Sequence, residues 1–318
     1  MSQIIVRHAS IGIEGKVNEY VDFEFRAGSA TCLSGGLFSL MDAAVFYKPI
    51  DYVRAGFIKG EILRGFEFAE ECTNVLTAEK PRFAQVFAPC HPTGFAAEYS
   101  GPLAGSMHLT GQFALLNGAS SQNLDEEYDT NIGFQLQTPV EGLSAGGFYS
   151  LLKKNYGYDQ QFELINGAGY RTGFGLDYDT HDLLFRGEYY LLKGYYNDPM
   201  NNTLYEDAAQ TQYIPSTELK MQAYYVEGGY AIHTGVEAMP AVLPYVRYQS
   251  WDKAANADGD HVYTYLTCGI SMALGNDQST ILRFDFDMPV DTPEGLEKDS
   301  EMLIVRLQTD LSLKQFHH

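Results

Sequence analysis

The sequence has few positive charges and no long apolar run, and each shortage excludes a class of protein. The chain holds 21 Lys and Arg against 41 Asp and Glu, for a formal net charge of −20. That balance argues against a broad basic surface for nucleic acid or anionic lipid. The most apolar segment, LTCGISMALG at 266–275, is shorter than the roughly 18 apolar residues of a transmembrane helix. We therefore expect neither a nucleic-acid-binding protein nor a helical membrane protein.

The sequence also lacks motifs that are typical of metal sites and enzymes. The four cysteines, Cys32, Cys72, Cys90 and Cys268, form no CxxC, no CxxCH and no zinc spacing. The histidines are scattered, and no GxSxG or HExxH motif is present. We expect no metal site, no cofactor and no enzymatic activity.

What the sequence does have is tyrosine, phenylalanine and a repeated alternation. It holds 23 Tyr and 19 Phe, residue types that favour strands and interfaces. In EYVDFEFRA at 19–27, apolar Val21, Phe23 and Phe25 alternate with polar residues, and TILRFDFDM at 280–288 repeats the design. A period of two indicates strands with one apolar and one charged face. The apolar face would contact a second sheet in a soluble sandwich or lipid in a membrane barrel.

The arrangement of strands and connections separates these two alternatives. We count about fifteen candidate strands, at 9–14, 19–27, 39–48, 51–57, 94–99, 107–116, 132–137, 143–151, 170–178, 183–191, 219–232, 242–250, 262–274, 280–288 and 301–311. Short turns alternate with long connections, which lie near 28–37, 60–92, 117–130, 152–166, 193–217, 251–261 and 289–300. Outer-membrane barrels keep short turns at one rim and long loops at the other. We therefore predict an all-β fold, a transmembrane antiparallel up-and-down β-barrel of about 16 strands, 15 of them read from this chain.

The charged phase of each strand then faces a water-filled lumen. The residues predicted to line the pore are Asp22, Glu24, Arg26, Arg54, Glu98, Arg171, Asp177, Arg186, Glu188, Arg247, Arg283, Asp285, Asp287 and Arg306, together with neutral His108, Gln112, Gln135 and Gln137. Alternatively, each of these side chains only binds a partner on a neighbouring strand and has no role in transport.

Several segments also resemble a known family. The stretches ASIGIEGKVNEYVDFEFRA, LMDAAVFYKPIDYVRAGFIKG and VFAPCHPTGFAAEYSG, the LLNG at 115–118 and the last strand, LIVRLQTDLSLKQF, resemble the phosphate-selective porins (O and P type) of Gram-negative outer membranes. The resemblance implies a sixteen-stranded barrel, commonly trimeric, whose third loop folds inward at 60–92 and narrows the pore. A short helix is expected at about 66–77. The constriction would then involve Arg64, Glu67, Glu70, Glu71, Glu79, Lys80 and Arg82.

Three features depart from the family pattern. The count of strands is odd, so an ascending strand before residues 3–14 is expected but not found in the sequence. The sequence has no closely spaced RxRxR run, whereas guanidinium groups are the natural partners of phosphate. Phe316 is also out of phase with Leu311 and Leu313, which predicts a bulge at the end of the last strand. We therefore expect a cation-preferring or weakly selective pore, with anion or phosphate selectivity as the alternative that the resemblance implies.

Two loops suggest further contacts. Cys72 and Cys90 both fall in the third loop, and a disulfide between them is expected to hold its shape in an oxidising compartment. The acidic run DEEYD at 125–129 suggests divalent cations that bridge to lipopolysaccharide, with a solvated charged loop as the alternative.

The whole pattern predicts a passive porin for small hydrophilic solutes or ions in the outer membrane of a Gram-negative bacterium. A structural or scaffold barrel with a plugged lumen or a bound partner protein is the alternative. We expect one barrel domain over residues 1–316, contacts with outer-membrane lipid and lipopolysaccharide, and a homo-oligomer. The start without a signal peptide and the terminal His317 and His318 are interpreted as a removed signal and a tag remnant.

Overall fold

A computed structural model describes most of the chain. The described residues are 8–30, 39–60, 62–66, 76–77, 80–83, 92–117, 128–158, 164–180, 182–196, 217–256, 261–275, 280–292 and 302–309. Within these ranges, no helix is long and apolar enough to cross a membrane.

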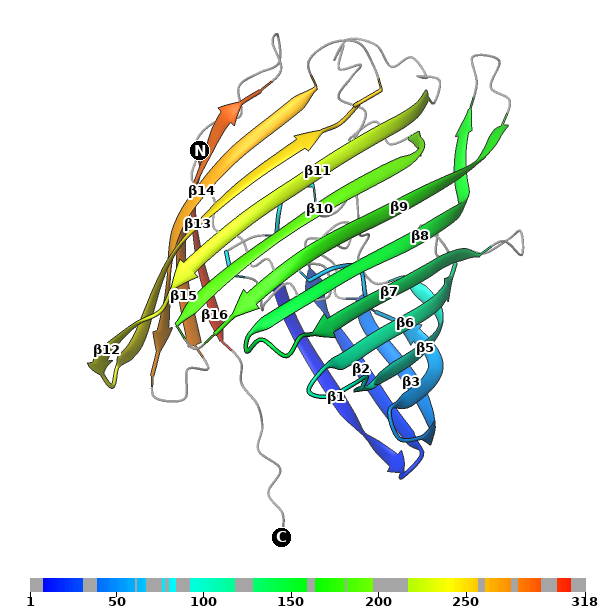
Figure 1. Ribbon diagram of the computed structural model, residues 1–318, viewed down its shortest axis with the longest axis horizontal. Helices are drawn as coiled ribbons and strands as arrows, with labels where there is room; N and C mark the ends of the chain where they lie inside the picture. Colours follow the sequence, from blue (N-terminus) through cyan, green and yellow to red (C-terminus); the bar gives the residue numbers. More distant parts are fainter. Residues whose placement is uncertain are drawn as a thin grey trace.

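Strands account for most of the described residues, and all of them join one antiparallel sheet (Figure 1). They are β1 His8–Asn18, β2 Val21–Ala30, β3 Ser39–Ile50, β4 Val53–Lys59, β5 Thr93–Pro102, β6 His108–Leu116, β7 Asp129–Gln137, β8 Leu143–Tyr158, β9 Leu164–Asp179, β10 Leu183–Tyr196, β11 Thr217–Tyr230, β12 Ile232–Val236, β13 Met239–Asp252, β14 Val262–Leu274, β15 Thr280–Asp291 and β16 Met302–Thr309. Each strand pairs with its neighbours in chain order, and the sheet curls into a barrel with tilted strands.

The number of strands matches the sequence prediction in detail. Fifteen strands form the continuous path of the sheet, and short β12 pairs with β13 beyond the end of β11. Each of the fifteen predicted segments falls on one strand of this path. Because every pairing is antiparallel, β1 and β16 run in the same direction. No pairing joins β1 to β16 among the described residues.

One predicted connection is wrong in extent. Residues 152–166 were expected to form a long loop, but β8 continues to Tyr158 and β9 begins at Leu164, and the two strands stay paired out to Tyr158 opposite Leu164. A bulge between Leu152 and Asn155 shifts the register there. The bulge interrupts the alternation on which the prediction depended, and the strand resumes beyond it.

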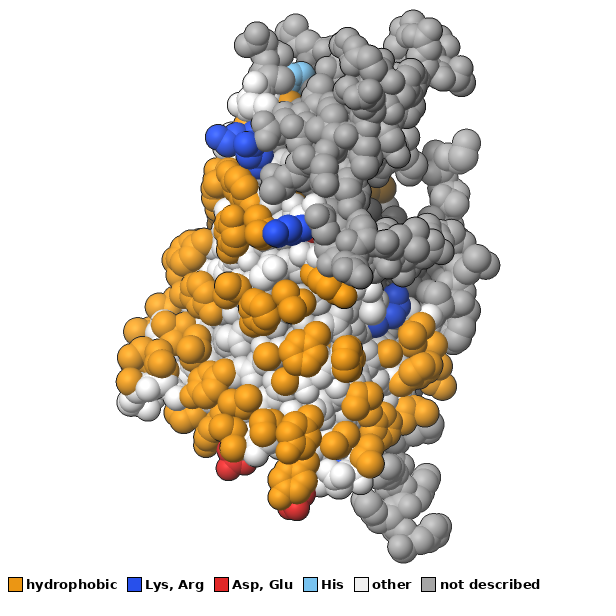
Figure 2. Space-filling model, turned by 90° about the vertical axis from the view of Figure 1, so that its right-hand side faces the viewer, with side chains coloured by type: hydrophobic (Ala, Val, Ile, Leu, Met, Phe, Trp, Pro, Cys, Tyr) orange, Lys and Arg blue, Asp and Glu red, His pale blue; other side chains and the backbone are white. Residues whose placement is uncertain are grey.

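The two faces of the sheet have opposite chemistry. Phe57 is 74% exposed on the outer face, whereas Phe46, on the inner face of neighbouring β3, is 9% exposed. Figure 2 shows the outward hydrophobic side chains as a broad belt, with acidic side chains at its lower edge. The stretch at 19–27 follows the same rule, because Phe25 points outward and is 48% exposed. An apolar belt of this size requires an apolar environment, and we expect that environment to be lipid.

The belt leads to a stability prediction. Phe174 lies outward on β9, so Phe174→Arg should lower the free energy of unfolding in lipid vesicles by about 2–4 kcal/mol if the site is deep in the bilayer. Urea titration followed by the fluorescence of Trp251, the single tryptophan, measures this difference.

The matched control is Ser144→Arg, which places the same side chain on the inner face directly opposite Asp177. We expect a change of less than about 1 kcal/mol there, since the new charge gains a partner. Equal losses at both positions would contradict the assignment of the faces.

Candidate functional site in the barrel lumen

A row of charged and polar side chains crosses six strands on the inner face. Successive cross-strand pairs join Asp177, Arg186, Glu227, Arg247, Thr267 and Asp287, from β9 to β15. The Arg186 Nε atom lies 2.7 Å from Asp177 Oδ1, and the Arg247 Nη2 atom lies 2.7 Å from Glu227 Oε2. These are charge-assisted bonds between almost fully buried groups. The predicted residues of this row therefore lie on the inner face, where Arg186 binds Asp177 and Arg247 binds Glu227.

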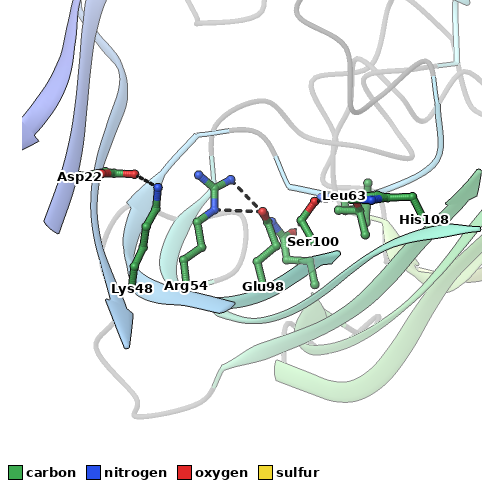
Figure 3. Close-up of polar contacts among 9 residues, drawn as sticks. Asp22, Lys48, Arg54, Leu63, Glu98, Ser100 and His108 are labelled. Carbon is green, nitrogen blue, oxygen red and sulfur yellow. Dashed lines mark hydrogen bonds and ion pairs between the residues drawn. The ribbon is translucent and has the colours of Figure 1, made fainter. Parts of the chain in front are cut away.

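A second group of charges lies on the inner face of β2 to β5. Arg54 binds Glu98 through two nitrogens, with Nε 2.9 Å from Oε1 and Nη2 3.1 Å from Oε2. Its guanidinium lies 4.4 Å from the centre of the Phe46 ring. Lys48 forms an ion pair with Asp22, and both pairs point from the wall in the same direction (Figure 3).

Arg26 completes this second group. Its guanidinium nitrogens lie 3.4 Å from a carboxylate oxygen of Glu24 and 3.6 Å from one of Asp42. The alternative of cross-strand pairing therefore describes Arg26, Arg54 and Arg186 correctly. A charge that is bound to a partner can still line the lumen. The pore-lining role of these arginines therefore stays a prediction.

The segment Ile62–Phe66, directly after β4, lies against the inner face of β6 and β7. The backbone N–H of Leu63 donates to Gln112 Oε1 at 2.8 Å, and the Asn131 amide donates to the Leu63 carbonyl at 3.2 Å. The Gln135 amide donates to the Gly65 carbonyl at 3.3 Å. Side chains of the wall thus satisfy backbone groups that would otherwise be buried without partners.

The end of this segment is held by Glu188 of β10. The carboxylate accepts the backbone N–H of Phe66 at 2.7 Å and the hydroxyl of Tyr225 at 2.5 Å, and Glu188 is 4% exposed. Gly65 has φ +95°, and a Cβ there would lie 2.2 Å from Glu188 Oε1. The turn therefore requires glycine both for its backbone conformation and for its contact with the carboxylate.

Glycines on the wall provide the space for the segment. A Cβ on Gly133 of β7 would lie 2.2 Å from the Leu63 carbonyl oxygen, and one on Gly146 of β8 would lie 3.2 Å from the Phe66 ring. The wall is therefore recessed where the segment crosses it, because a side chain at Gly133 would occupy the position of the Leu63 carbonyl.

A second segment, Lys80–Phe83, is fixed to the wall between β10 and β15. The backbone N–H of Arg82 donates to Gln249 Oε1 at 2.9 Å. Its guanidinium binds Asp287 Oδ2 through Nε at 3.0 Å and Nη2 at 2.7 Å, and it lies 4.0 Å from the centre of the Tyr265 ring. Phe83, which is 1% exposed, packs against the rings of Tyr190 and Tyr225.

Other predicted pore residues also lie on the inner face. Asp285 accepts a hydrogen bond from the Tyr245 hydroxyl. Arg283 donates to Gln308 Oε1 at 2.7 Å and lies directly opposite Arg306. Arg171 lies opposite Ser150 and is half-buried.

Part of the predicted constriction falls outside the described residues. This applies to Glu67, Glu70, Glu71, Glu79, Cys72 and Cys90, and also to Cys32 and to Asp125, Glu126 and Glu127 of the acidic loop. Of the expected helix at 66–77, the described residues Phe66, Leu76 and Thr77 lie in bends. Arg64 is 4% exposed, and Cys268 is a free cysteine that is exposed on the outer face.

Sequence reasoning missed several side chains of the inner face. Glu227, Lys48 and Asp42 were not assigned to the lumen, and neither was Asn131. A signal existed for Glu227, because it follows Tyr225 at a spacing of two and thereby shares its face. The same spacing places Asn131 on the face of Gln135 and Gln137, but its bond to Leu63 depends on a segment far away in the sequence.

The recess at Gly133 can be tested directly. Gly133→Val should displace Ile62–Phe66 from the wall, because the new side chain collides with the Leu63 carbonyl. We expect trypsin to cleave the folded barrel after Arg64 at least several times faster, measured by mass spectrometry of the fragments. In Gly111→Val, the matched control on β6, an added Cβ meets no atom within 4 Å. Equal cleavage rates in the two variants would show that the recess does not hold the segment.

Comparisons with known proteins agree on the fold. No family model matches the chain, and no curated protein matches its sequence. Among solved structures, the outer membrane channel DcaP of Acinetobacter baumannii has a TM-score of 0.57 at 10% identity, over 94% of this chain and 83% of that one. OmpF of Salmonella typhi, in complex with daunomycin, has a TM-score of 0.56 at 15% identity, over 92% and 84%. A porin has a TM-score of 0.53 at 10% identity, over 94% and 90%. The chain therefore has a porin-like β-barrel fold.

Proposed function

We propose that the chain forms a water-filled channel in the outer membrane of a Gram-negative bacterium, through which small hydrophilic solutes or ions diffuse passively. The observation that carries the proposal is the inverted chemistry of the barrel, with large apolar side chains exposed outside and charged side chains inside. Charged side chains on the inner face fit a lumen that water and solutes enter. The similarity to porin structures supports the same function.

The distribution of charge supports weak selectivity. The described residues hold 20 of the 41 acidic residues and 18 of the 21 basic residues, so the described part of the chain is nearly neutral. Most of the net charge of −20 therefore belongs to the remaining segments of the sequence. On the wall itself, arginines are paired with carboxylates. We propose a mild preference for cations that arises from the overall charge, with little selection by the wall.

The finer family assignment also belongs to this proposal. The sequence segments that resemble phosphate-selective porins support a trimer, and the acidic run at 125–129 supports contact with lipopolysaccharide. Phosphate selectivity itself has less support, because the arginines at 54, 82, 186 and 247 are all bound to carboxylates. The inward segments are proposed as the narrowest part of the channel.

The proposal is tested by single-channel recording in a planar bilayer under a KCl gradient. We expect steady current with a reversal potential that favours potassium near 0.1 M salt and declines toward 1 M, because the screening length falls from about 10 Å to about 3 Å. A preference for chloride with block by phosphate would support the anion-selective alternative. Absence of current from a folded, heat-modifiable barrel would overturn the channel and leave a plugged or scaffold barrel.

The contact between Arg82 and Asp287 gives a second prediction. Asp287→Asn removes the charge that holds Lys80–Phe83 on the wall, so this segment should move more freely. We expect a change of at least about 20% in single-channel conductance and more current noise, with little change in heat-modifiable migration. The side chain of Arg82 is 29% exposed, so water can solvate its charge once the partner is neutral.

Asp177→Asn is the matched control. It removes a similar contact with Arg186 at 2.7 Å, within the wall itself and without a bond from Asp177 to either inward segment. Its conductance should stay close to that of the unmodified channel. A similar change in both variants would mean that Asp287 does not act through Arg82.

A further inference from the structure

The two end strands of the sheet, β1 and β16, each have one edge without a partner strand among the described residues. The path from β1 to β16 contains fifteen strands, and every pairing along it is antiparallel. Both end strands therefore run in the same direction, and each ends at the rim with the short turns. The sheet curls so that its two ends turn toward each other (Figure 1). An open edge in lipid leaves backbone N–H and C=O groups without hydrogen bonds, so both edges require a partner.

We infer that β1 and β16 pair with each other in parallel and close the barrel, with Glu14 beside Arg306 on the lumen side of this seam. The inference rests on the proposed membrane channel, because an edge in water can bind water instead. An odd number of strands that are otherwise antiparallel closes only through one parallel pair. The hydrogen bonds of such a pair are slanted and evenly spaced, and they satisfy the backbone of both edges.

The charges of the two end strands support this pairing. Glu14 of β1 lies on the inner face directly opposite Glu24, and Arg306 of β16 lies on the inner face directly opposite Arg283. Like charges directly opposite each other destabilise a strand pair. A seam that brings Glu14 beside Arg306 gives each of them a neighbour of opposite charge. The acidic end of the sheet thus complements the basic end.

The two charges also lie at similar heights in the barrel. Glu14 lies four residues before the end of β1, and Arg306 lies three residues before the end of β16. When Glu14 is placed beside Arg306, Lys16 comes beside Gln308. The same register therefore creates no new contact between like charges on the inner face.

The outer faces of the two strands continue the apolar belt across the seam. In the same register, Ile11 comes beside Leu303 and Ile13 comes beside Val305. All four side chains are more than half exposed. Side by side, they form one apolar surface toward lipid, as the outside of a membrane barrel requires.

A strand between β1 and β16, antiparallel to both, is the competing way to satisfy the two edges. It would correspond to the ascending strand that the odd count predicts. Two strand spacings would then separate β1 from β16 by about 10 Å, and Glu14 would not reach Arg306 directly. The direct seam is favoured because the two ends have complementary charges at matching heights.

Disulfide cross-linking tests the distance across the seam. Ile13→Cys and Val305→Cys are combined in a background with the four native cysteines replaced by serine, and the folded barrel in lipid vesicles is oxidised with copper phenanthroline. A disulfide requires Cα atoms within about 7 Å of each other, which only adjacent strands satisfy. The matched control is Val246→Cys with Cys268 retained, a pair that lies directly opposite on the outer face of β13 and β14. We expect the 13–305 pair to cross-link within about tenfold of the control rate, measured by mass spectrometry.

Shifted pairs test the register. Leu303→Cys and Leu307→Cys, each combined with Ile13→Cys, move the partner by two residues along β16. Faster cross-linking of either pair would overturn the contact between Glu14 and Arg306. Absence of a disulfide in all three pairs, with cross-linking only by a bismaleimide that spans about 10 Å, would overturn the seam and indicate a strand between the two edges.

The cross-links need no current, so the seam and the proposed function are judged separately. Heat-modifiable migration first shows that each variant is folded. A barrel that forms the 13–305 disulfide but carries no current would refute the channel and leave the seam in place. A conducting barrel without the disulfide would refute the seam alone.

A double-mutant cycle tests the charge contact. Glu14→Gln and Arg306→Gln are made singly and together, and unfolding in urea is followed by the fluorescence of Trp251, the single tryptophan. If the two side chains meet, the double variant should unfold at a higher urea concentration than the sum of the two single shifts predicts. Additive shifts would overturn the contact between Glu14 and Arg306.

Discussion

The register of the antiparallel ladder is the constraint on which the rest of this structure depends. Every strand places successive side chains on opposite faces, so a shift of one residue would move phenylalanines inside and arginines outside. The observed register places Arg54 opposite Glu98 and Arg247 opposite Glu227. Each arginine thus finds its carboxylate on the neighbouring strand, and the pairing energy and the burial of the apolar face favour the same register.

The buried pairs have an energetic consequence for the wall. Arg247 and Glu227 are nearly inaccessible to water, and the cost of desolvating two such charges largely offsets their attraction. Removal of one partner leaves the other charge buried alone, which typically costs about 3–5 kcal/mol. Such pairs therefore add little net stability, but they strongly disfavour any arrangement that separates them. In this barrel they oppose sliding of β11 against β13, and the wall behind the inward segments stays in one register.

The sequence predicted the strands well, because period and turn chemistry are local properties. All fifteen segments were found, and the alternation at 19–27 and 280–288 assigned the correct face to Phe25 and Asp285. The extension of β8 and β9 was missed, because the bulge near Leu152 interrupts the period. The difference in exposure between Arg54 and Arg247 was also out of reach. The two have the same pattern in sequence, yet the side chain of Arg54 is 39% exposed and that of Arg247 is 2% exposed.

The inward segment Ile62–Phe66 shows why the site was harder to predict than the fold. Four of its hydrogen bonds to the wall use its backbone, through the N–H groups of Leu63 and Phe66 and the carbonyls of Leu63 and Gly65. Its side chains are buried as well, and Ile62 packs with Phe46 and Ala96 of the wall. The hydrogen-bond partners lie in the wall beside Gly133, as amides and a carboxylate on strands about 50 to 120 residues away. The position of the segment is therefore specified by residues that, in the sequence, look like ordinary alternating strand positions.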